Sequence, residues 1–146
     1  MKLSNRKSKL EISILGYEFP NSVDKFDANW LRVGITADDD GMTWTAVDSS
    51  LRTFELVELL SWFESISSGA SNVKDLNFTE QELGFGFTEE HELLVRLDFG
   101  FHPTGEKYDY DADKEVILRF KLSELNLSGV VDSLLKSIKQ FPEKKF

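Results

Sequence analysis

The stretch LRVGITADDDGMTWTA, residues 31–46, decides the fold class of this chain. Apolar residues alternate with polar or small ones over residues 31–37 and again over 42–46, the period of two that a half-buried β-strand shows. Asp40 and Gly41 lie between the two runs, and Asp-Gly in this position is a strong signal for a tight hairpin turn. The stretch therefore predicts two antiparallel strands joined by a turn.

The same alternation recurs on both sides of this hairpin. Residues 10–14 predict a strand before it, and strand patterns return between Leu76 and Phe101, where the longest alternating run predicts a strand over 91–101. A last alternating run covers residues 116–122. Clean alternation in the strands favours antiparallel pairing, with one side of the sheet facing solvent.

Two segments change to the period of an α-helix. Residues 53–69 place Leu56, Leu59, Leu60, Phe63 and Ile66 on one face, with Val57 and Trp62 off that stripe. Residues 127–141 keep helical spacing for nearly four turns, including Val131, Leu134, Leu135 and Ile138 on one predicted face. Thr53 and Ser128 are the predicted N-caps, Gly69 closes the first helix, and Pro142 ends the second.

The predicted fold class is α+β: a single curved antiparallel β-sheet of about seven strands, with two helices packed on its apolar face. The 146 residues fit one domain, 1–146, with a basic N-terminal tail of about residues 1–8. No cysteine is present, so a disulfide framework and a thiolate metal site are both excluded.

Charge is distributed unevenly along the chain. Residues 11–135 hold 25 acidic residues against 9 basic ones, in a chain of net charge −9. Such a field repels nucleic acid and anionic membranes and attracts basic partners, although solubility alone is an alternative reason for it. The N-terminus lacks a signal-peptide core, and no segment approaches membrane-spanning length, so we expect a cytoplasmic protein.

Catalytic and metal-binding patterns are scarce. His91 and His102 lie at the two ends of the predicted strand 91–101, roughly 33 Å apart at about 3.3 Å per residue, too far to share a metal. We expect both to be surface loop residues. The sequence nominates no nucleophile and no carboxylate pair, so we predict no catalytic residue, metal or cofactor.

The segment YDYDADKE, residues 108–115, resembles the start of a calcium-binding loop. Asp109, Asp111 and Asp113 match the first three ligand positions of an EF-hand. Lys114 stands where the loop needs glycine, and Phe120 where it needs a bidentate glutamate. A solvated acidic loop is therefore the better prediction.

The connection GYEFPNSVDKFDANWLRV, residues 16–33, carries unusual aromatic surface. Phe19, Phe26 and Trp30 occur there together with Asp24 and Asp27. A connection of this length should be exposed, so its aromatic residues either pack against the edge of the sheet or bind a partner. The sequence leaves both interpretations open.

Several segments together resemble one known family. They are ILGYEFPN…DANWLRV, then W…D.SLRTFELVELLSWFE, then LNFTEQELGF, and the closing helix that ends KQFP. This order of motifs is similar to the WapI-type immunity proteins, small bacterial proteins associated with polymorphic contact-dependent toxins. One departure is Gln81, where the resemblance predicts proline.

The resemblance implies a non-enzymatic protein that binds and neutralises the toxin domain of its own system in the cytoplasm. It supplies no catalytic residues. The partner is then a cognate toxin C-terminal domain, expected to be basic, with no nucleic acid or membrane partner and an undetermined oligomeric state. The candidate partner-binding residues are Asp24, Asp27, Asp38, Asp39, Asp40, Asp109, Asp111, Asp113, Phe19, Phe26 and Trp30.

Two other classes of function stay open at this point. A small-ligand or carbohydrate-binding module would use an aromatic-lined face of the sheet, and its sign would be a preformed pocket. A carboxylate enzyme would require two acids with separated pKa values in one cleft.

Overall fold

The computed structural model describes residues 1–146 and contains two four-stranded antiparallel sheets and two α-helices. The first sheet has the order β1 (Lys2–Ser4), β2 (Ser8–Tyr17), β3 (Trp30–Asp39), β4 (Met42–Arg52). The second has the order β5 (Leu76–Asn77), β6 (Leu83–Phe87), β7 (Glu92–Leu97), β8 (Val116–Lys121). The helices are α1 (Thr53–Ser67) and α2 (Leu127–Gln140).

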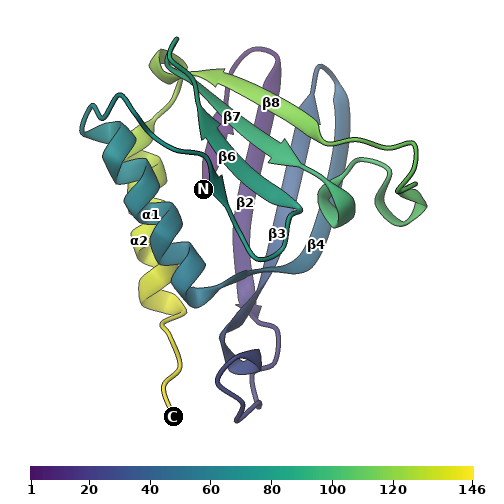
Figure 1. Ribbon diagram of the computed structural model, residues 1–146, viewed down its shortest axis with the longest axis vertical. Helices are drawn as coiled ribbons and strands as arrows, with labels where there is room; N and C mark the ends of the chain where they lie inside the picture. Colours follow the sequence, from purple (N-terminus) through teal and green to yellow (C-terminus); the bar gives the residue numbers. More distant parts are fainter.

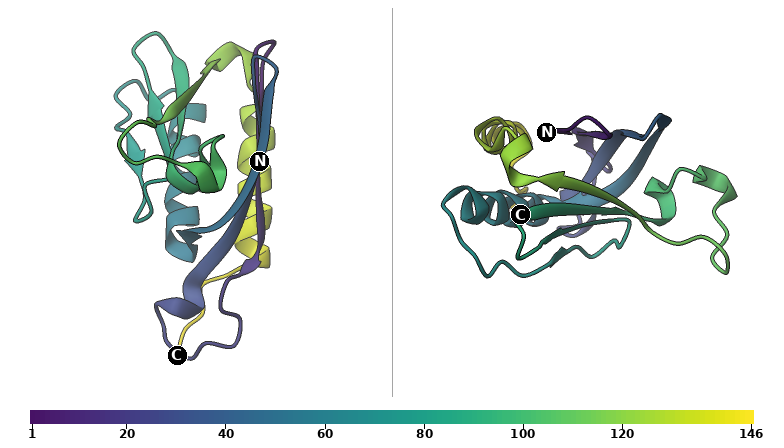
Figure 2. Two further views of the ribbon diagram at one scale, coloured as in Figure 1. Left: turned by 90° about the vertical axis from the view of Figure 1, so that its right-hand side faces the viewer. Right: turned by 90° about the horizontal axis from the view of Figure 1, so that it is seen from above.

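The two sheets form separate layers, and the helices lie side by side along one edge of them (Figures 1 and 2). One hydrophobic core joins both sheets and both helices. Its largest fully buried side chains include Phe63 on α1, Phe85 on β6 and Phe120 on β8. The prediction of α+β is thus confirmed.

The prediction of a single seven-stranded sheet is wrong. After β4 the chain runs through α1 into a second layer, and none of β5–β8 pairs with a strand of the first sheet. Alternation in a strand shows that one face is apolar, and another sheet can cover that face as well as a helix can. The pattern therefore established the faces of the strands without establishing which strands share a sheet.

The predicted hairpin at residues 31–46 is confirmed. Asp39 pairs with Met42 at its end, and the two turn residues Asp40 and Gly41 have φ angles of 54° and 90°. An Asp38 carboxylate oxygen accepts a hydrogen bond from the Gly41 amide at 2.9 Å. Two positive φ angles are what a type I′ turn requires, which explains the Asp-Gly sequence.

Both helices are confirmed, but their caps differ from the prediction. At α1 the Glu55 carboxylate accepts from the Arg52 amide at 2.9 Å, while the Thr53 hydroxyl donates to Asn29 instead of capping. At α2 the cap is Asn126, whose side-chain oxygen accepts from the Gly129 amide at 3.1 Å. Gly69 follows α1 with a φ of 90°, as expected for a helix-ending glycine.

The predicted strand 91–101 is too long. β7 ends at Leu97, and residues 99–101 form the short 3₁₀ helix η2 (Phe99–Phe101), in which Phe99 has a φ of 47°. At the other end of the chain, residues 2–4 of the supposed basic tail form β1, and Leu3 is buried. The helices of this fold are too short or too polar to cross a membrane.

Candidate functional site

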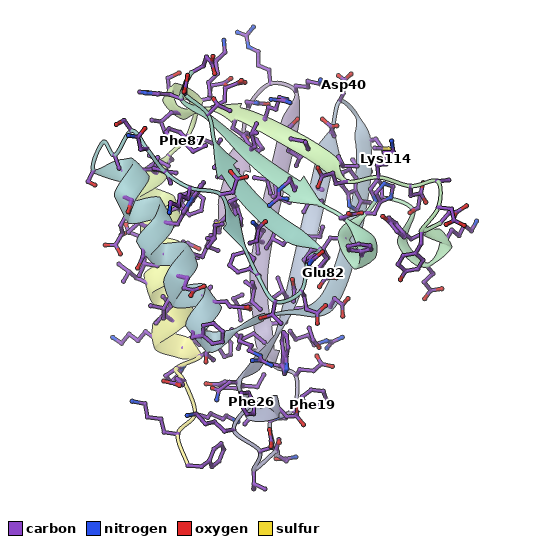
Figure 3. The ribbon with its side chains drawn as sticks, viewed as in Figure 1. Phe19, Phe26, Asp40, Glu82, Phe87 and Lys114 are labelled. Atoms are coloured by element: carbon purple, nitrogen blue, oxygen red, sulfur yellow. The ribbon has the colours of Figure 1, made fainter.

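The candidate acids predicted from the sequence lie in three separate places. Asp40, with Asp38 and Asp39, lies at the tip of the β3–β4 hairpin, at one end of the first sheet (Figure 3). Asp24 and Asp27 belong to the same loop as Phe19 and Phe26, which lie beyond the opposite end of that sheet (Figure 3). Asp109 and its neighbours belong to the long connection between β7 and β8. The structure therefore does not gather the predicted acids into one cluster.

Half of these acids hold their own turns together. Asp24 accepts hydrogen bonds from the amides of Phe26 and Asp27 at 2.9 and 3.0 Å. Asp109 accepts from the Asp111 amide at 2.9 Å, and an Asp113 oxygen accepts from the Asp109 amide at 2.8 Å. Asp and Asn commonly form such turns, so this bonding explains the residue types without requiring a ligand.

The base of the loop at residues 18–29 is firmly held by the C-terminal segment. The buried Asn29 side chain donates to the Lys144 carbonyl at 3.0 Å and accepts from the Lys144 amide at 2.8 Å. The Tyr17 hydroxyl donates to the Pro142 carbonyl at 2.5 Å, and the Lys144 ammonium lies 4.2 Å from the centre of the Tyr17 ring. These contacts join residues more than 100 positions apart.

The far end of the same loop is apolar and exposed. Phe19 is 46% exposed, Val23 84% and Phe26 64%, and we refer to these three residues as the loop tip. The Arg52 guanidinium lies over the half-buried Trp30 ring at 4.6 Å and within 5.4 Å of the Phe26 ring. The base of the loop therefore packs against the fold, while its tip faces solvent, and binding of a partner by the tip stays a prediction.

A second feature was not predicted from the sequence. A cavity of about 430 Å³ opens between β4, the β5–β6 connection and the 3₁₀ helices η2 and η3 (Gly105–Lys107). Its acidic lining residues are Asp48, Glu80, Glu82 and Glu106, and its aromatic ones are Phe99, Tyr108 and Tyr110. We call this the acidic cleft. No lysine, arginine or histidine lines it.

Glu82 forms the enclosed part of the acidic cleft, beside η2 in Figure 3. Its side chain is only 5% exposed, and its Oε1 atom has no hydrogen-bond partner. Burial, followed by the neighbouring Asp48 and Glu80, raises the pKa of Glu82 to about 8, although the adjacent Ser50 hydroxyl acts in the opposite direction. Glu82 is therefore protonated at neutral pH in the free protein.

Another glutamate shows what an ordinary buried carboxylate looks like in this fold. Glu55 is 2% exposed and accepts hydrogen bonds from the Arg52 amide at 2.9 Å, the Thr79 amide at 2.8 Å and the Thr79 hydroxyl at 2.6 Å. Buried carboxylates are normally satisfied in this way. Glu82 is the exception, because its buried Oε1 atom has no hydrogen-bond partner, and neither has the Oγ atom of the adjacent buried Ser50.

The backbone opposite Glu82 is shaped to admit the two carboxylates. A Cβ atom at Gly100 would lie 2.7 Å from an oxygen of Asp48 and 2.7 Å from an oxygen of Glu82, so glycine alone fits there without a shift. The left-handed Phe99 directly before it is an uncommon conformation for a bulky residue. The close approach of Asp48 and Glu82 thus depends on this local backbone.

The far wall of the acidic cleft is braced by hydrogen bonds. The Tyr108 hydroxyl donates to Asp98 at 2.6 Å, and Asp98 also accepts from the Phe99 amide at 2.9 Å. The bond to Asp98 raises the pKa of Tyr108 to about 12, so the phenol stays protonated. Phe99, Tyr108 and Tyr110 stand 5.2–5.9 Å apart, ring centre to ring centre, as one aromatic group.

The remaining titratable groups do not build a metal centre. No three His, Asp or Glu side chains are arranged to hold a metal ion. His102 is buried, contrary to the prediction of a surface position, and its Nδ1 pairs with the Thr104 hydroxyl at 2.7 Å. His91 is exposed and stacks on Phe87 at 5.6 Å.

One weak sign of the acidic cleft is visible in the sequence. Glu82 stands two positions before Gly84 and four before Gly86, on the side of β6 where close backbone approach was expected. With 26 acidic residues in the chain, that sign does not single out Glu82. Its environment is set by Asp48 and Gly100, which lie far from it in the sequence.

Comparison with known proteins gives one match. Neither the curated proteins nor the solved structures include one similar to this chain. The model of the family described as Immunity protein WapI-like matches residues 2–142. The match extends from β1 past the end of α2 and takes in both the loop at residues 18–29 and the acidic cleft. The chain therefore belongs to the WapI-like immunity protein family.

Proposed function

We propose that this protein binds the C-terminal domain of the toxin of its own system and neutralises it in the bacterial cytoplasm. The observation that carries the proposal is the family match over residues 2–142, because immunity proteins of this family are generally non-enzymatic. The protein then acts by occupying a surface of the toxin rather than by modifying it.

The charge of the molecule supports a basic partner. Only two ion pairs join its side chains, Arg32 with Glu18 at 3.8 Å and Arg96 with Glu115 at 4.0 Å. Nearly all of the 26 acidic side chains are therefore uncompensated by a direct cationic partner. Complementary charge of this kind speeds the encounter with a basic protein.

An aromatic-lined sheet face, which a carbohydrate-binding module would use, has little support. Trp44 on β4 is half-buried and its indole donates to the Phe101 carbonyl at 2.9 Å, toward the second sheet. The exposed apolar residues on the strands are aliphatic: Leu15, Met42 and Val47. The exposed aromatic rings stand instead at the loop tip, at the rim of the acidic cleft, at the start of α1 (Phe54) and at the C-terminus (Phe146).

The test is coexpression with the toxin domain encoded beside this chain. Cells that produce the toxin domain with this protein should grow, and cells that produce it with an immunity protein from an unrelated system should not. The purified pair should elute as one complex in size-exclusion chromatography. Growth arrest in the presence of this protein, together with no complex, would overturn the proposed function.

A further inference from the structure

We infer that the acidic cleft receives a basic side chain of the partner protein, arginine in the best-fitting case, seated against Asp48 and Glu82. This inference rests on the proposed function and specifies the surface through which it operates. It follows from three observations: the composition of the cleft, an unsatisfied carboxyl at its enclosed end, and the aromatic group on its wall.

The composition of the cleft selects the charge of the ligand. Four carboxyl-bearing residues line it and no basic residue does, so its own chain supplies no counter-ion. In the free protein the proton held by Glu82 limits the repulsion between these carboxyl groups, and a positive group beside them can take the place of that proton. A ligand with a single positive head meets this requirement.

Glu82 shows that one polar contact is missing in the free protein. Its Oε1 atom is buried without a donor, whereas the equally buried Glu55 has three donors. Leaving a buried acceptor unsatisfied is unfavourable, and an N–H group arriving at this position would remove the penalty. The exposed Asp48 and Glu80 line the same cleft and supply further acceptors.

The aromatic wall distinguishes an organic cation from a metal ion. Tyr110 is 80% exposed at the rim, next to Tyr108 and Phe99, and a guanidinium or ammonium group gains attraction over such rings. The carboxylates are not arranged as a metal-binding set of three. A planar guanidinium stacks on aromatic rings and binds two carboxylate oxygens at once. It therefore fits both the aromatic and the acidic lining of the cleft best.

Binding should be linked to the protonation of Glu82. A cation beside it favours the carboxylate form, so association releases up to one proton below about pH 8, and affinity rises by up to tenfold per pH unit there. The other titratable groups of the cleft are Asp48 on β4, Glu80 on the β5–β6 connection, and Glu106, Tyr108 and Tyr110 across from them. None of them carries a positive charge that would compete for Glu82.

The experiment measures dissociation of the purified toxin domain by biolayer interferometry. The variants are E82Q and the double variant D48N/E82Q, with the exposed pair E89Q/E90Q as a control that also replaces two acids by amides. We expect the dissociation rate to increase at least tenfold for D48N/E82Q and to stay within twofold for E89Q/E90Q. The wild-type Kd should fall between pH 6.0 and 8.5, and this fall should be lost in E82Q.

A further variant, G100A, keeps every charge but places a methyl group where the two carboxylates converge. G100A should also accelerate dissociation. Because its net charge is that of the wild type, such an effect would come from the geometry of the cleft. Circular dichroism confirms that each variant is folded.

Three outcomes would overturn the inference or its basis, and they are distinguishable. If the wild type does not bind the toxin domain, the proposed function fails. If the wild type binds and D48N/E82Q and G100A both dissociate like E89Q/E90Q, the function stands and the cleft is not the contact. Micromolar binding of arginine amide or spermidine to the isolated protein, lost in E82Q, would make the cleft a small-molecule site.

Discussion

The loop at residues 18–29 and the acidic cleft use the same kinds of residue, aromatic and acidic, in opposite ways. In the loop the exposed Asp24 accepts hydrogen bonds from the loop's own backbone, while Phe19 and Phe26 face solvent. In the cleft the aromatic rings contact one another, and the enclosed acid Glu82 lacks a partner. The loop is therefore locally complete, whereas the cleft is missing a contact.

This difference predicts different roles in binding. Exposed charges at the rim of an interface mainly change the association rate and its dependence on salt. Desolvated groups near its centre mainly change the dissociation rate. We accordingly expect the acidic loops to guide the toxin domain and the acidic cleft to retain it.

The largest expected effect is on the core that supports both regions. Leu134 on α2 is 3% exposed, and L134A should lower the free energy of unfolding by about 2–5 kcal/mol, because it removes buried methyl groups and leaves a cavity. Leu135, which the sequence placed on the same buried face, is 48% exposed. L135A is therefore a matched control that should change stability by less than about 1 kcal/mol.

Denaturant unfolding of the two variants measures this difference. Equal losses of stability would mean that α2 is packed differently from the structure described above.

The second effect concerns pH. The pKa of Glu82 is raised from its ordinary value of 4.5 to about 8, so the folded protein holds a proton that the unfolded chain releases in this range. The stability that this group contributes is complete below about pH 4.5 and is lost as the pH rises toward 8. Between pH 6 and 9 the loss should be on the order of 2–3 kcal/mol.

The variant E82Q should remove this part of the pH dependence, because its amide does not titrate. The exposed E89Q should retain the wild-type slope. Thermal and urea unfolding at several pH values would measure the contrast. Parallel curves for the wild type and E82Q would show that Glu82 is not protonated in the fold.

The sequence predicted local structure well and assembly poorly, for a physical reason. The hairpin at residues 31–46 and the helices depend on residues close in the chain, whose periods and turn residues are visible directly. The division into two sheets depends on which apolar faces meet, and alternation is the same in either arrangement. Phe99 lies outside β7, contrary to the prediction, because its neighbours Asp98 and Gly100 favour a turn. Alternation of apolar and polar residues does not reveal that turn.

The candidate site was predicted only in part for the same reason. The aromatic loop stood out because its residues are contiguous in sequence. Glu82 did not stand out, since its state depends on burial and on Asp48, a residue of the other sheet. Residue type and spacing identify exposed acids readily, but a buried acid is identified only by its three-dimensional surroundings.

The third effect concerns the base of the loop. Replacing Asn29 with alanine removes its hydrogen bonds to Lys25, Lys144 and Thr53 and leaves the buried Thr53 hydroxyl unpaired. N29A should therefore lower the free energy of unfolding by about 1–2 kcal/mol and increase protease cleavage within residues 18–28. The exposed Asn21, in the same loop, provides the control N21A, which should change neither quantity.

If N29A is as stable and as protease-resistant as N21A, the C-terminal segment does not hold the loop. The distinction between a fixed base and an exposed tip would then have to be abandoned.

The smallest expected effect lies in the exposed acids. Changing Asp38, Asp39 and Asp40 together to asparagine, and in a separate variant Asp109, Asp111 and Asp113, should slow association with the toxin domain about two- to fivefold and weaken its salt dependence. Dissociation should change little, because these side chains are exposed or half-buried, and Asp38, Asp109 and Asp113 bond to their own turns. Unfolding curves should differ from wild type only slightly, since asparagine also accepts the turn hydrogen bonds.

If association is unchanged in both variants while D48N/E82Q dissociates rapidly, the loop acids serve solubility and the cleft alone carries the charge complementarity. If instead both triple variants dissociate rapidly, the acidic loops are themselves desolvated in the complex, and the division between guiding and retaining surfaces is wrong.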